Sequence, residues 1–588
     1  MPSLVRTTRS LGRNLSLQAA RCVSGRGRFP GTGPAPWGPP ARARPTKLRD
    51  PHGSRIQTRL ITTETTTFIY DDTIYALSTA QGRAGIAVIR VSGPGCKDVY
   101  HGLCPNKPLP KPRYAAVRTL TDSQAGADAI LDSDALVLYF PGPKTVTGED
   151  VLELHVHGGL ATVKAVLAAI PKCKPTGVGA IRYAEPGEFT KRAFLNDRLD
   201  LAQVESLGDT LAADTEQQRR AAVRGNSGSL GRTYEAWRSQ LLLARGEIEA
   251  LIDFSEDQHF DESPGELMGN VSRLVADMRR SIRAHEEAGQ RGELLRKGIR
   301  VALLGPPNVG KSSLMNLVVG REASIVSREA GTTRDVVEVS LDIRGYLCSF
   351  ADTAGIRTKS SVAEGEDLFE PALGMVEEEG IRRARQKASE SDVVVVLAAV
   401  EPACGGSGFR INFDAETLEL AAQAQACLVI VNKRDAVDES TFTSLLENFR
   451  SEIAARVPDL HNTEILTISC REAQSKSPSS SPTTKEDPGA IHALIDRLVG
   501  SFSGMTDLPS DQQDLLGVTA RQAQLLEQCR GFLDEFMEVA HPEEDYGDEP
   551  DIVLAAEHLR YAAECLAKIT GRVEAGDVED VLGVIFEK

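Results

Sequence analysis

The spacing of apolar and polar residues divides this chain into stretches of different character. Between residue 70 and about residue 187, short apolar runs at 86–91, 135–140 and 151–155 alternate with turns and a few helical segments. Runs of this length, bounded by turn residues, predict strands of a mixed α+β domain. Beyond residue 187 the apolar period changes to three and four residues, which is typical of helices.

Two blocks of helical pattern flank a region of strand pattern. In the first block, one apolar stripe contains Leu230, Tyr234, Trp237, Leu241, Ile248 and Leu251. A stripe of this kind predicts the core of a helical bundle. The second block, from about 511 to 588, has the same amphipathic character. We therefore expect one bundle into which an α/β unit is inserted.

Four apolar runs in the inserted region, at 299–304, 346–350, 427–431 and 464–468, each end at a short polar motif. The first motif is Gly305-Pro306-Pro307-Asn308-Val309-Gly310-Lys311-Ser312-Ser313. A glycine-rich loop between a strand and a helix presents backbone N–H groups to phosphate, while Lys311 can reach the outer phosphates and the Ser312 hydroxyl can bind Mg²⁺. Taken alone, the motif is also compatible with a chance match in a glycine-rich turn.

The other three motifs follow in the order that a GTPase requires. Asp352-Thr353-Ala354-Gly355 supplies a carboxylate that holds Mg²⁺ through water and a glycine N–H that senses the γ-phosphate. In Asn432-Lys433-Arg434-Asp435, the last carboxylate can accept hydrogen bonds from the N1–H and the exocyclic amine of guanine, a donor pair that adenine lacks. Ser469-Cys470 offers a backbone N–H to the guanine carbonyl. Together the four motifs predict GTP binding.

Ile356 directly follows the motif Asp352-Thr353-Ala354-Gly355. Ras-type GTPases have glutamine at this position, where it orients the attacking water. Because an aliphatic side chain cannot do this, another group must position the water and offset the developing charge. Asn308 and the segment 327–335 supply the oxygen atoms that a monovalent cation requires. This pattern resembles the potassium-activated GTPases, and in particular the MnmE/TrmE family of tRNA modification GTPases.

Motifs outside the GTPase region strengthen the resemblance. They are the segments 72–74, 82–93, 147–154, 157–159, 186–196, 199–203 and 566–571, and with them the resemblance covers about residues 70–586. It implies a multidomain protein of α+β and α/β class. The expected parts are a transit peptide at 1–68, a folate-binding-like α+β domain at 69–187, a helical domain at 188–297 and 506–588, and a GTPase domain at 298–505 inserted into the bundle.

The resemblance also implies roles for individual residues. Those expected to contact GTP are Gly305, Asn308, Val309, Gly310, Lys311, Ser312, Ser313, Thr332, Thr333, Asp352, Thr353, Ala354, Gly355, Asn432, Lys433, Asp435, Ser469 and Cys470. Those expected to bind ions are Ser312 and Thr333 for Mg²⁺, and Asn308, Ser327, the Glu329 carbonyl and Thr332 for K⁺. The catalytic, water-positioning residue is Glu377, in a register that depends on extra residues at 360–371.

Three further residues, Arg90, Glu149 and Arg198, are expected from the resemblance to contact a reduced folate such as 5-formyltetrahydrofolate. Ordinary ion pairing at the surface is the alternative for any one of them. Members of the family usually end in Phe-Cys-x-Gly-Lys, with the Cys implicated in modification and the Lys in folate binding, whereas this chain stops at Ile585-Phe586-Glu587-Lys588. We therefore expect the sequence as written to hydrolyse GTP but to need that tail for modification. The alternative is that the last residues only fray and have no role.

For activity, the resemblance implies a GTP hydrolase that works as a homodimer, whose GTPase domains meet when GTP and potassium are bound. With an FAD-containing partner of the MnmG/GidA type, proteins of this family place an aminomethyl-type substituent on carbon 5 of the wobble uridine of tRNA. The reduced folate supplies the one-carbon unit.

The distribution of charge adds an expected compartment. Residues 1–60 hold eleven Arg and one Lys against a single acid, Asp50, and this net charge of +11 leaves −27 on the rest of a chain whose total is −16. An Arg-rich, acid-poor leader resembles a mitochondrial transit peptide and predicts the matrix as the destination, with a basic RNA-binding arm as the alternative. Because the body is acidic, it must hold tRNA through a local patch or through the partner.

Other patterns argue against a membrane span, a disulfide framework and a metal site, and they predict three loops. No apolar run reaches the ~18 residues expected of a membrane span. Ten cysteines without a Cys-x-x-Cys pair indicate neither a disulfide framework nor a zinc site. His155 and His157 share one face of a predicted strand, but no third metal ligand is evident nearby, so we expect a structural role. Segments 401–408, 475–489 and 543–551, rich in small or acidic residues, predict loops.

Two other functions share part of this pattern. A ribosome-assembly GTPase would carry the same nucleotide motifs, but it should also carry a basic RNA-binding domain, and no KH-like unit is visible in the sequence. The second alternative is a folate-dependent aminomethyltransferase that the GTPase domain regulates. The wobble-uridine substituents of mitochondrial tRNA from a deletion strain would separate the three functions.

Overall fold

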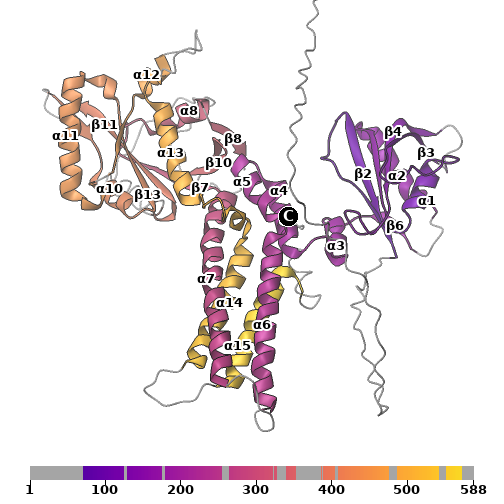
Figure 1. Ribbon diagram of the computed structural model, residues 1–588. Helices are drawn as coiled ribbons and strands as arrows, with labels where there is room; N and C mark the ends of the chain where they lie inside the picture. Colours follow the sequence, from indigo (N-terminus) through magenta and orange to yellow (C-terminus); the bar gives the residue numbers. More distant parts are fainter. Residues whose placement is uncertain are drawn as a thin grey trace, which may run out of the picture. The chain divides into compact units, whose positions relative to one another are not determined.

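Two sheets and a set of long helices make up the described part of the chain (Figure 1). The computed structural model describes residues 71–122, 124, 129–174, 179–254, 264–321, 323–327, 339–351, 386, 388–403, 408–461, 463–475, 487–541 and 551–572. The expected leader at 1–68 and the last four residues, 585–588, lie outside these ranges.

The first group of elements is a sheet with helices, as the short apolar runs predict. Its elements are β1 Thr73–Leu77, β2 Ile86–Ser92, α1 Cys96–Leu103, β3 Ala116–Thr121, β4 Ile130–Phe140, β5 Val151–His157, α2 Leu160–Ala169, the 3₁₀ turn η1 Ile170–Lys172, β6 Ile181–Tyr183 and α3 Glu188–Leu195. The strand order is β3-β4-β5-β2-β1-β6, and every pair is antiparallel except β1 with β6. The three predicted strands are confirmed as β2, β4 and β5. Alternate side chains of β2 are buried, and they share one core with α1 and α2.

Long helices form the second group. They are α4 Leu201–Ala212, α5 Glu216–Gly225, α6 Ser229–Phe254, α7 Pro264–Lys297, α14 Ala520–Ala540 and α15 Ile552–Thr570, with the 3₁₀ turn η4 Gln513–Gly517 before α14. Helices α6, α7, α14 and α15 contribute to a single apolar core and lie side by side in Figure 1. The predicted stripe is confirmed on α6, where Leu230, Tyr234, Leu241 and Ile248 are buried and Trp237 packs against them. Helices from both sides of the strand-rich region therefore build one core.

The third group is an eight-stranded sheet with helices on its faces. Its elements are β7 Ile299–Leu304, α8 Lys311–Arg321, β8 Ala323–Ser327, β9 Val339–Ile343, β10 Tyr346–Ala351, β11 Val393–Pro402, β12 Phe409–Asn412, α10 Ala415–Ala422, β13 Ala426–Asn432, η2 Arg434–Ala436, α11 Glu439–Arg456, η3 Pro458–Leu460, β14 Ile465–Thr467, α12 Cys470–Ser475 and α13 Ile491–Thr506. The order is β14-β13-β11-β7-β10-β9-β8, with β12 paired to β11. The four predicted strands are confirmed as β7, β10, β13 and β14, and these pair in parallel within the run from β14 to β10.

The prediction of a loop at 401–408 is wrong at its start. Glu401 and Pro402 end β11, because they pair in antiparallel register with Arg410 and Phe409 of β12. The run of small residues at 404–407 lies outside the described ranges. Most of the other two predicted loops, 476–486 and 543–550, also lies outside them. Asp551 at the end of the acidic segment caps α15, since its side chain accepts a hydrogen bond from the Leu554 N–H at 3.0 Å.

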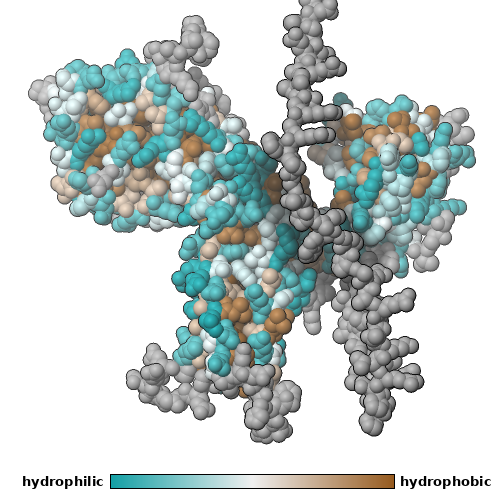
Figure 2. Space-filling model, viewed as in Figure 1, coloured by the Kyte–Doolittle hydropathy of each residue, from teal (hydrophilic) through white to brown (hydrophobic). Residues whose placement is uncertain are grey.

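The described surface gives no sign of a membrane span. Among the described helices, none is long and apolar enough to cross a bilayer. On the face drawn in Figure 2, hydrophilic residues cover much of the surface and hydrophobic residues gather in separate patches.

Candidate functional site

The loop between β7 and α8 has a backbone path that only glycine can follow at two positions. Gly305 has φ +145°, and a Cβ there would lie 2.2 Å from the carbonyl oxygen of Leu397 on β11. Gly310 has φ +101°, and a Cβ there would lie 2.4 Å from Nδ2 of Asn432. Both approaches are far shorter than a real Cβ contact. The two glycines let the loop pass close to its neighbouring strands and turn into α8.

Lys311 begins α8 and folds back over this loop. Its Nζ donates hydrogen bonds to the carbonyl oxygens of Gly305 at 2.6 Å and of Pro306 at 2.8 Å. Burial lowers the pKa of this ammonium group. The loop therefore holds a positive charge beside the N-terminus of an eleven-residue helix, where unpaired backbone N–H groups and the helix dipole favour an anion.

Three other predicted residues lie within three positions of Lys311 in the sequence. Ser312 and Ser313 occupy the first turn of α8, and both are partly exposed. Asn308 is exposed on the loop and has φ +65°, a left-handed conformation that asparagine tolerates better than most residues. The chain thus presents hydroxyl and amide oxygens at the same end of α8 as Lys311.

Asn432, at the end of β13, ties the phosphate loop to the guanine motifs. Its side chain is buried, and its Nδ2 donates to the carbonyl oxygen of Val309 at 2.8 Å. Its Oδ1 accepts from the N–H of Lys433 at 2.7 Å and from the N–H of Cys470 at 3.2 Å. One amide therefore uses both of its ends to fix three of the predicted motifs relative to one another.

Asp435 and Ser469 meet across the ends of β13 and β14. The Ser469 hydroxyl donates to Asp435 Oδ1 at 2.6 Å and accepts from the Glu472 N–H at 3.0 Å. The N–H of Ser469 itself donates to the Gly489 carbonyl at 3.1 Å. This arrangement orients the Asp435 carboxylate, while the contact of a Ser469 or Cys470 N–H with guanine stays a prediction.

A carboxylate that the sequence did not single out supports Lys433. Lys433 Nζ lies 3.0 Å from Oε1 of Glu401, and Oε2 of Glu401 accepts from Nδ2 of Asn412 at 3.0 Å. The pairing of β11 with β12 brings Glu401 and Asn412 to this place. The signal in the sequence was weak because the segment 401–408 reads as a loop.

The remaining predicted residues of the nucleotide site lie outside the described ranges. They are Glu329, Thr332, Thr333, Asp352, Thr353, Ala354, Gly355 and Glu377. Ser327 is described as the last residue of β8. The Mg²⁺, K⁺ and catalytic assignments to these residues therefore stay predictions.

The three residues predicted for folate have protein partners in the N-terminal domain. Arg90 on β2 pairs with Glu153 on β5, Nη2 to Oε1 at 3.0 Å. Arg198 donates from Nε to the Thr145 carbonyl at 2.9 Å. Glu149 accepts from the Ser92 hydroxyl at 2.8 Å. Arg90 thus has the ion pair that was the alternative reading, and a folate role for the three residues is untested.

Glu149 belongs to a buried ion-pair cluster centred on Arg192, a residue that sequence reasoning missed. Arg192 is fully buried on α3. Its guanidinium lies 2.8 Å from Asp72, 3.1 Å from Glu149 and 3.1 Å from Glu188. Arg182 on β6 joins the cluster through Asp72 and Glu188. We call Asp72, Glu149, Arg182, Glu188 and Arg192 the arginine cluster.

The carboxylates of the arginine cluster differ in pKa. Burial raises the pKa of Glu149, and the nearby Arg192 offsets this only in part. Burial also opposes ionisation of Asp72 and Glu188, but hydrogen bonds and charges from Arg182 and Arg192 outweigh it and lower both pKa values. Asn196 supplies a further polar group in this domain. Its Oδ1 is buried and has no hydrogen-bond partner among the described residues. Its Nδ2 donates to the Thr147 carbonyl at 2.7 Å.

Each histidine of β5 lies near a carboxylate of the same sheet. His157 Nδ1 lies 2.9 Å from Asp132 Oδ1, and His155 Nε2 lies 3.5 Å from Glu153 Oε2. In the part of the chain that the structure describes, no group of three or more His, Cys, Asp or Glu residues could hold a metal ion.

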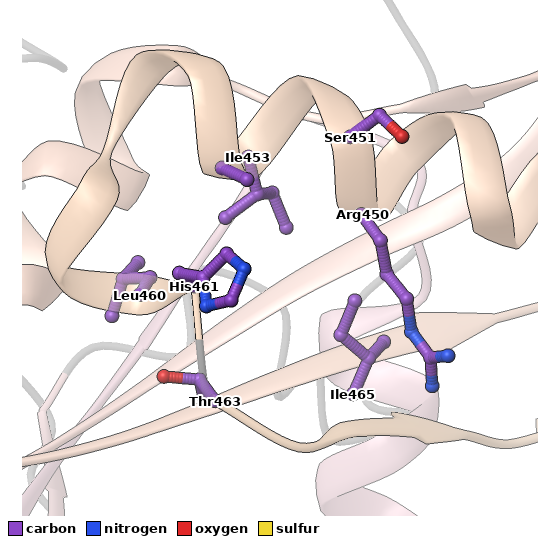
Figure 3. Close-up of a pocket in the computed structure, with 8 residues that line it drawn as sticks. Arg450, Ser451, Ile453, Leu460, His461, Thr463 and Ile465 are labelled. Carbon is purple, nitrogen blue, oxygen red and sulfur yellow. The ribbon is translucent and has the colours of Figure 1, made fainter.

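A pocket of about 360 Å³ opens elsewhere in the third group of elements. Figure 3 shows its lining by residues of α11, of η3 and its following turn, and of β14, namely Arg450, Ser451, Ile453, Leu460, His461, Thr463 and Ile465. None of the predicted nucleotide residues lines it, so we do not assign the nucleotide to this pocket.

Comparison with known proteins identifies relatives over nearly the whole described chain. The model "GTP-binding protein TrmE N-terminus" matches residues 73–198, and the model "MnmE helical domain" matches residues 201–588. The "tRNA modification GTPase MnmE" of Parvibaculum lavamentivorans is 39% identical over 515 residues, which is 88% of this chain and 98% of that protein.

Two eukaryotic relatives are similar over the same share of the chain. The human "5-taurinomethyluridine-[tRNA] synthase subunit GTPB3, mitochondrial" is 36% identical over 521 residues, or 88% of this chain and 92% of that protein. The "tRNA modification GTPase MSS1, mitochondrial" of Saccharomyces cerevisiae is 34% identical over 529 residues, again 88% and 92%.

Proposed function

The chain belongs to the MnmE/TrmE family and is a GTPase, and on this premise we propose that it acts in the modification of the wobble uridine of mitochondrial tRNA. The names of the human and yeast relatives place those proteins in tRNA modification and in the mitochondrion. The Arg-rich stretch at 1–60 supports delivery of this chain to the mitochondrial matrix.

One observation carries the nucleotide part of the proposal, namely the hydrogen bonding of Asn432. This buried amide holds the phosphate loop at Val309 and the guanine motifs at Lys433 and Cys470 in one arrangement. A nucleotide that reaches from Lys311 to Asp435 then finds cationic and carboxylate ends already positioned. Such positioning lowers the entropy cost of binding.

In this arrangement the chain's own residues bind and orient GTP. Backbone N–H groups at the start of α8 and the Lys311 ammonium bind the phosphates, and the Asp435 carboxylate accepts from guanine. The Ser312 hydroxyl, with Thr333 and Asp352, would hold Mg²⁺, which supplies charge neutralisation when bound. Glu377 is the proposed residue that orients water, because Ile356 cannot.

We also propose the family's other components for this chain. Asn308, with Ser327, Glu329 and Thr332, would hold K⁺. A homodimer would bring two GTPase domains together, and an FAD-containing partner of the MnmG/GidA type would act with it on tRNA. A reduced folate would lie near Arg90, Glu149 and Arg198.

Complementation of a deletion strain tests the function. The chain is expressed with the family's terminal Phe-Cys-Val-Gly-Lys added, alongside Lys311→Ala and a control, Lys164→Ala, at an exposed position of α2. We expect the extended chain without a substitution and its Lys164→Ala control to restore the wobble-uridine substituent in mitochondrial tRNA, measured by mass spectrometry of nucleosides. We expect Lys311→Ala to fail. Normal wobble uridine in the deletion strain, with a defect in ribosome subunits instead, would favour the ribosome-assembly alternative.

Potassium dependence tests the cation assignment separately. We expect GTP hydrolysis by the unaltered chain to be faster in K⁺ than in Na⁺, because a cage of carbonyl and amide oxygens fits the larger ion better. Asn308→Ala should lose this preference and still bind GDP. Equal rates of the unaltered chain in the two salts would remove the potassium site from the proposal without affecting the family assignment.

A further inference from the structure

A stretch of the N-terminal sheet domain carries positive charge in an otherwise acidic body. Between residues 99 and 121 the chain has no Asp or Glu, and it holds Lys107, Lys111, Arg113 and Arg118. The stretch runs from α1 through an irregular segment into β3, which is the first strand in the order β3-β4-β5-β2-β1-β6 and so has a free edge. We call residues 105–118 with Lys144 the basic edge.

The basic edge is fixed by hydrogen bonds to uncharged groups. The Tyr100 hydroxyl donates to the Pro108 carbonyl at 2.7 Å and accepts from Arg118 Nε at 2.8 Å. The Arg113 N–H donates to the Tyr139 carbonyl at 2.8 Å, and the Arg113 guanidinium donates to the carbonyl of Lys144. These bonds hold the irregular segment against β4 and bring Lys144 beside it.

The charges of the basic edge are not neutralised within the described residues. None of Lys107, Lys111, Arg113, Arg118 and Lys144 forms an ion pair with a described carboxylate, and Asp122, the first acid after the stretch, is paired with Lys172 at 2.6 Å. By contrast, Arg219 and Arg220 on α5 both pair with Glu216 at 2.8 Å. The basic edge therefore has a positive electrostatic potential that can attract an anionic partner.

An exposed aromatic ring stands among these charges. Tyr114 is 63% exposed, and the Nζ of Lys111 lies 5.2 Å from the centroid of its ring. Val117 on β3, three residues further along the chain, is 58% exposed. Unpaired Lys and Arg next to an exposed ring are the combination that single-stranded nucleic acid uses, because phosphates meet the cations and a base stacks on the ring.

We propose that the basic edge is a docking surface for tRNA, with Lys107, Lys111, Arg113 and Lys144 on phosphates and Tyr114 under an unstacked base. This inference rests on the proposed function, which requires tRNA as a substrate. Charge complementarity indicates which partner binds here. The chain outside residues 1–60 has a net charge of −27 and so repels a polyanion, except where a local patch of positive charge attracts it. An acidic face of a second copy of this chain is the competing occupant.

Charge reversal at two residues tests the docking surface. Lys107→Glu/Lys111→Glu changes exposed side chains that form no hydrogen bond with the described residues. Lys164→Glu/Lys568→Glu makes the same change in net charge at exposed positions on α2 and α15. We expect the first pair to weaken binding of a mitochondrial tRNA transcript by about tenfold or more at moderate salt, and to reduce the slope of log affinity against log salt by about 2. The control pair should change neither by as much.

Two further measurements make the test specific. Tyr114→Ala should weaken tRNA binding by about tenfold with little change in the salt slope, because it removes stacking and no charge. GTP hydrolysis in the absence of tRNA should be unchanged in every variant. Lysines and prolines at a sheet edge also prevent edge-to-edge pairing, but Glu serves that purpose as well as Lys, so a purely protective role predicts unchanged tRNA affinity.

Several outcomes would overturn the proposal. Equal weakening by the two charge-reversed pairs would show that only net charge matters. A change of oligomeric state by light scattering, with tRNA affinity unchanged, would assign the basic edge to a contact between copies. No tRNA binding by the unaltered chain would also overturn it, and successful complementation would then leave the proposed function standing, with the partner holding the tRNA.

Discussion

The guanine site and the arginine cluster gather polar groups in opposite ways. At the guanine site, Asn432, Lys433 and Asp435 lie within four consecutive residues at the end of β13, and Ser469 follows the neighbouring parallel strand β14. In the arginine cluster, Asp72, Glu149 and Arg192 come from separate segments, and Arg192 and Asp72 are 120 residues apart. A parallel sheet brings local motifs together at one edge, whereas the cluster exists only when the whole N-terminal domain is folded.

The two regions also differ in exposure to water. The side chains of the Lys433–Glu401 pair are 36% and 24% exposed, so water screens their attraction. Arg192 is fully buried, and its carboxylate partners Glu149 and Glu188 are 12% and 8% exposed. Removing one partner of a buried group leaves a charge without compensation, which costs far more than losing a screened pair. The cluster should therefore govern stability, and the guanine site should govern ligand choice.

The largest expected effect is on stability, from Arg192→Met. This change leaves the carboxylates of Asp72, Glu149 and Glu188 without their shared cation. We expect it to destabilise the N-terminal domain by about 3–5 kcal/mol. Hydrogen exchange of peptides from residues 71–122 and 129–174 should show the loss, while GTP hydrolysis, which uses the other sheet, should be retained.

Arg219→Met is the matched control for this prediction. Arg219 pairs with Glu216 on the surface of α5, with side chains 51% and 44% exposed. Loss of such a solvated pair should change stability little, because water screens the attraction. Similar destabilisation by the two substitutions would remove the contrast between a buried cluster and a screened pair.

The second expected effect is on base choice, from Asp435→Asn. An amide can no longer accept both hydrogen bonds from guanine, but its N–H group can donate to the carbonyl at position 2 of xanthine. We expect GTP affinity to fall by about 10²-fold and xanthosine triphosphate to become the preferred nucleotide, measured by competition with a fluorescent analogue. Asp438→Asn, which keeps a residue able to cap α11, should leave base choice unchanged. Unaltered GTP affinity in Asp435→Asn would contradict the guanine assignment.

The contrast between local motifs and contacts among distant segments explains which parts of the fold and of the site could be predicted from the sequence. The strands β7, β10, β13 and β14 and the stripe on α6 followed from local apolar patterns, and the motif residues at the strand ends came with them. Arg192 lies inside the 186–196 motif, yet its role could not be predicted there, because its partners come from the residue before β1, from the 147–154 segment and from its own helix. Glu401 was missed for a related reason, since only the pairing of β11 with β12 turns a low-complexity segment into support for Lys433.

The smallest expected effect is on nucleotide affinity, from Glu401→Gln, and it asks whether a group found only through the fold contributes to the local guanine motif. Glu401 holds Lys433 through a partly exposed pair, so its loss should weaken GTP and GDP binding by only a few-fold, consistent with about 1 kcal/mol or less for a screened pair. The rate of hydrolysis at saturating GTP should not change, because Lys433 is expected to bind the base and not the reacting phosphate. Glu452→Gln, which breaks the exposed pair with Arg456 on α11, serves as the control and should leave affinity unaltered.

In a Lys433→Met background, Glu401→Gln should have no further effect, since the two residues act through one contact. An undiminished effect in that background would show that Glu401 acts through Asn412 and the hairpin, independently of the guanine motif.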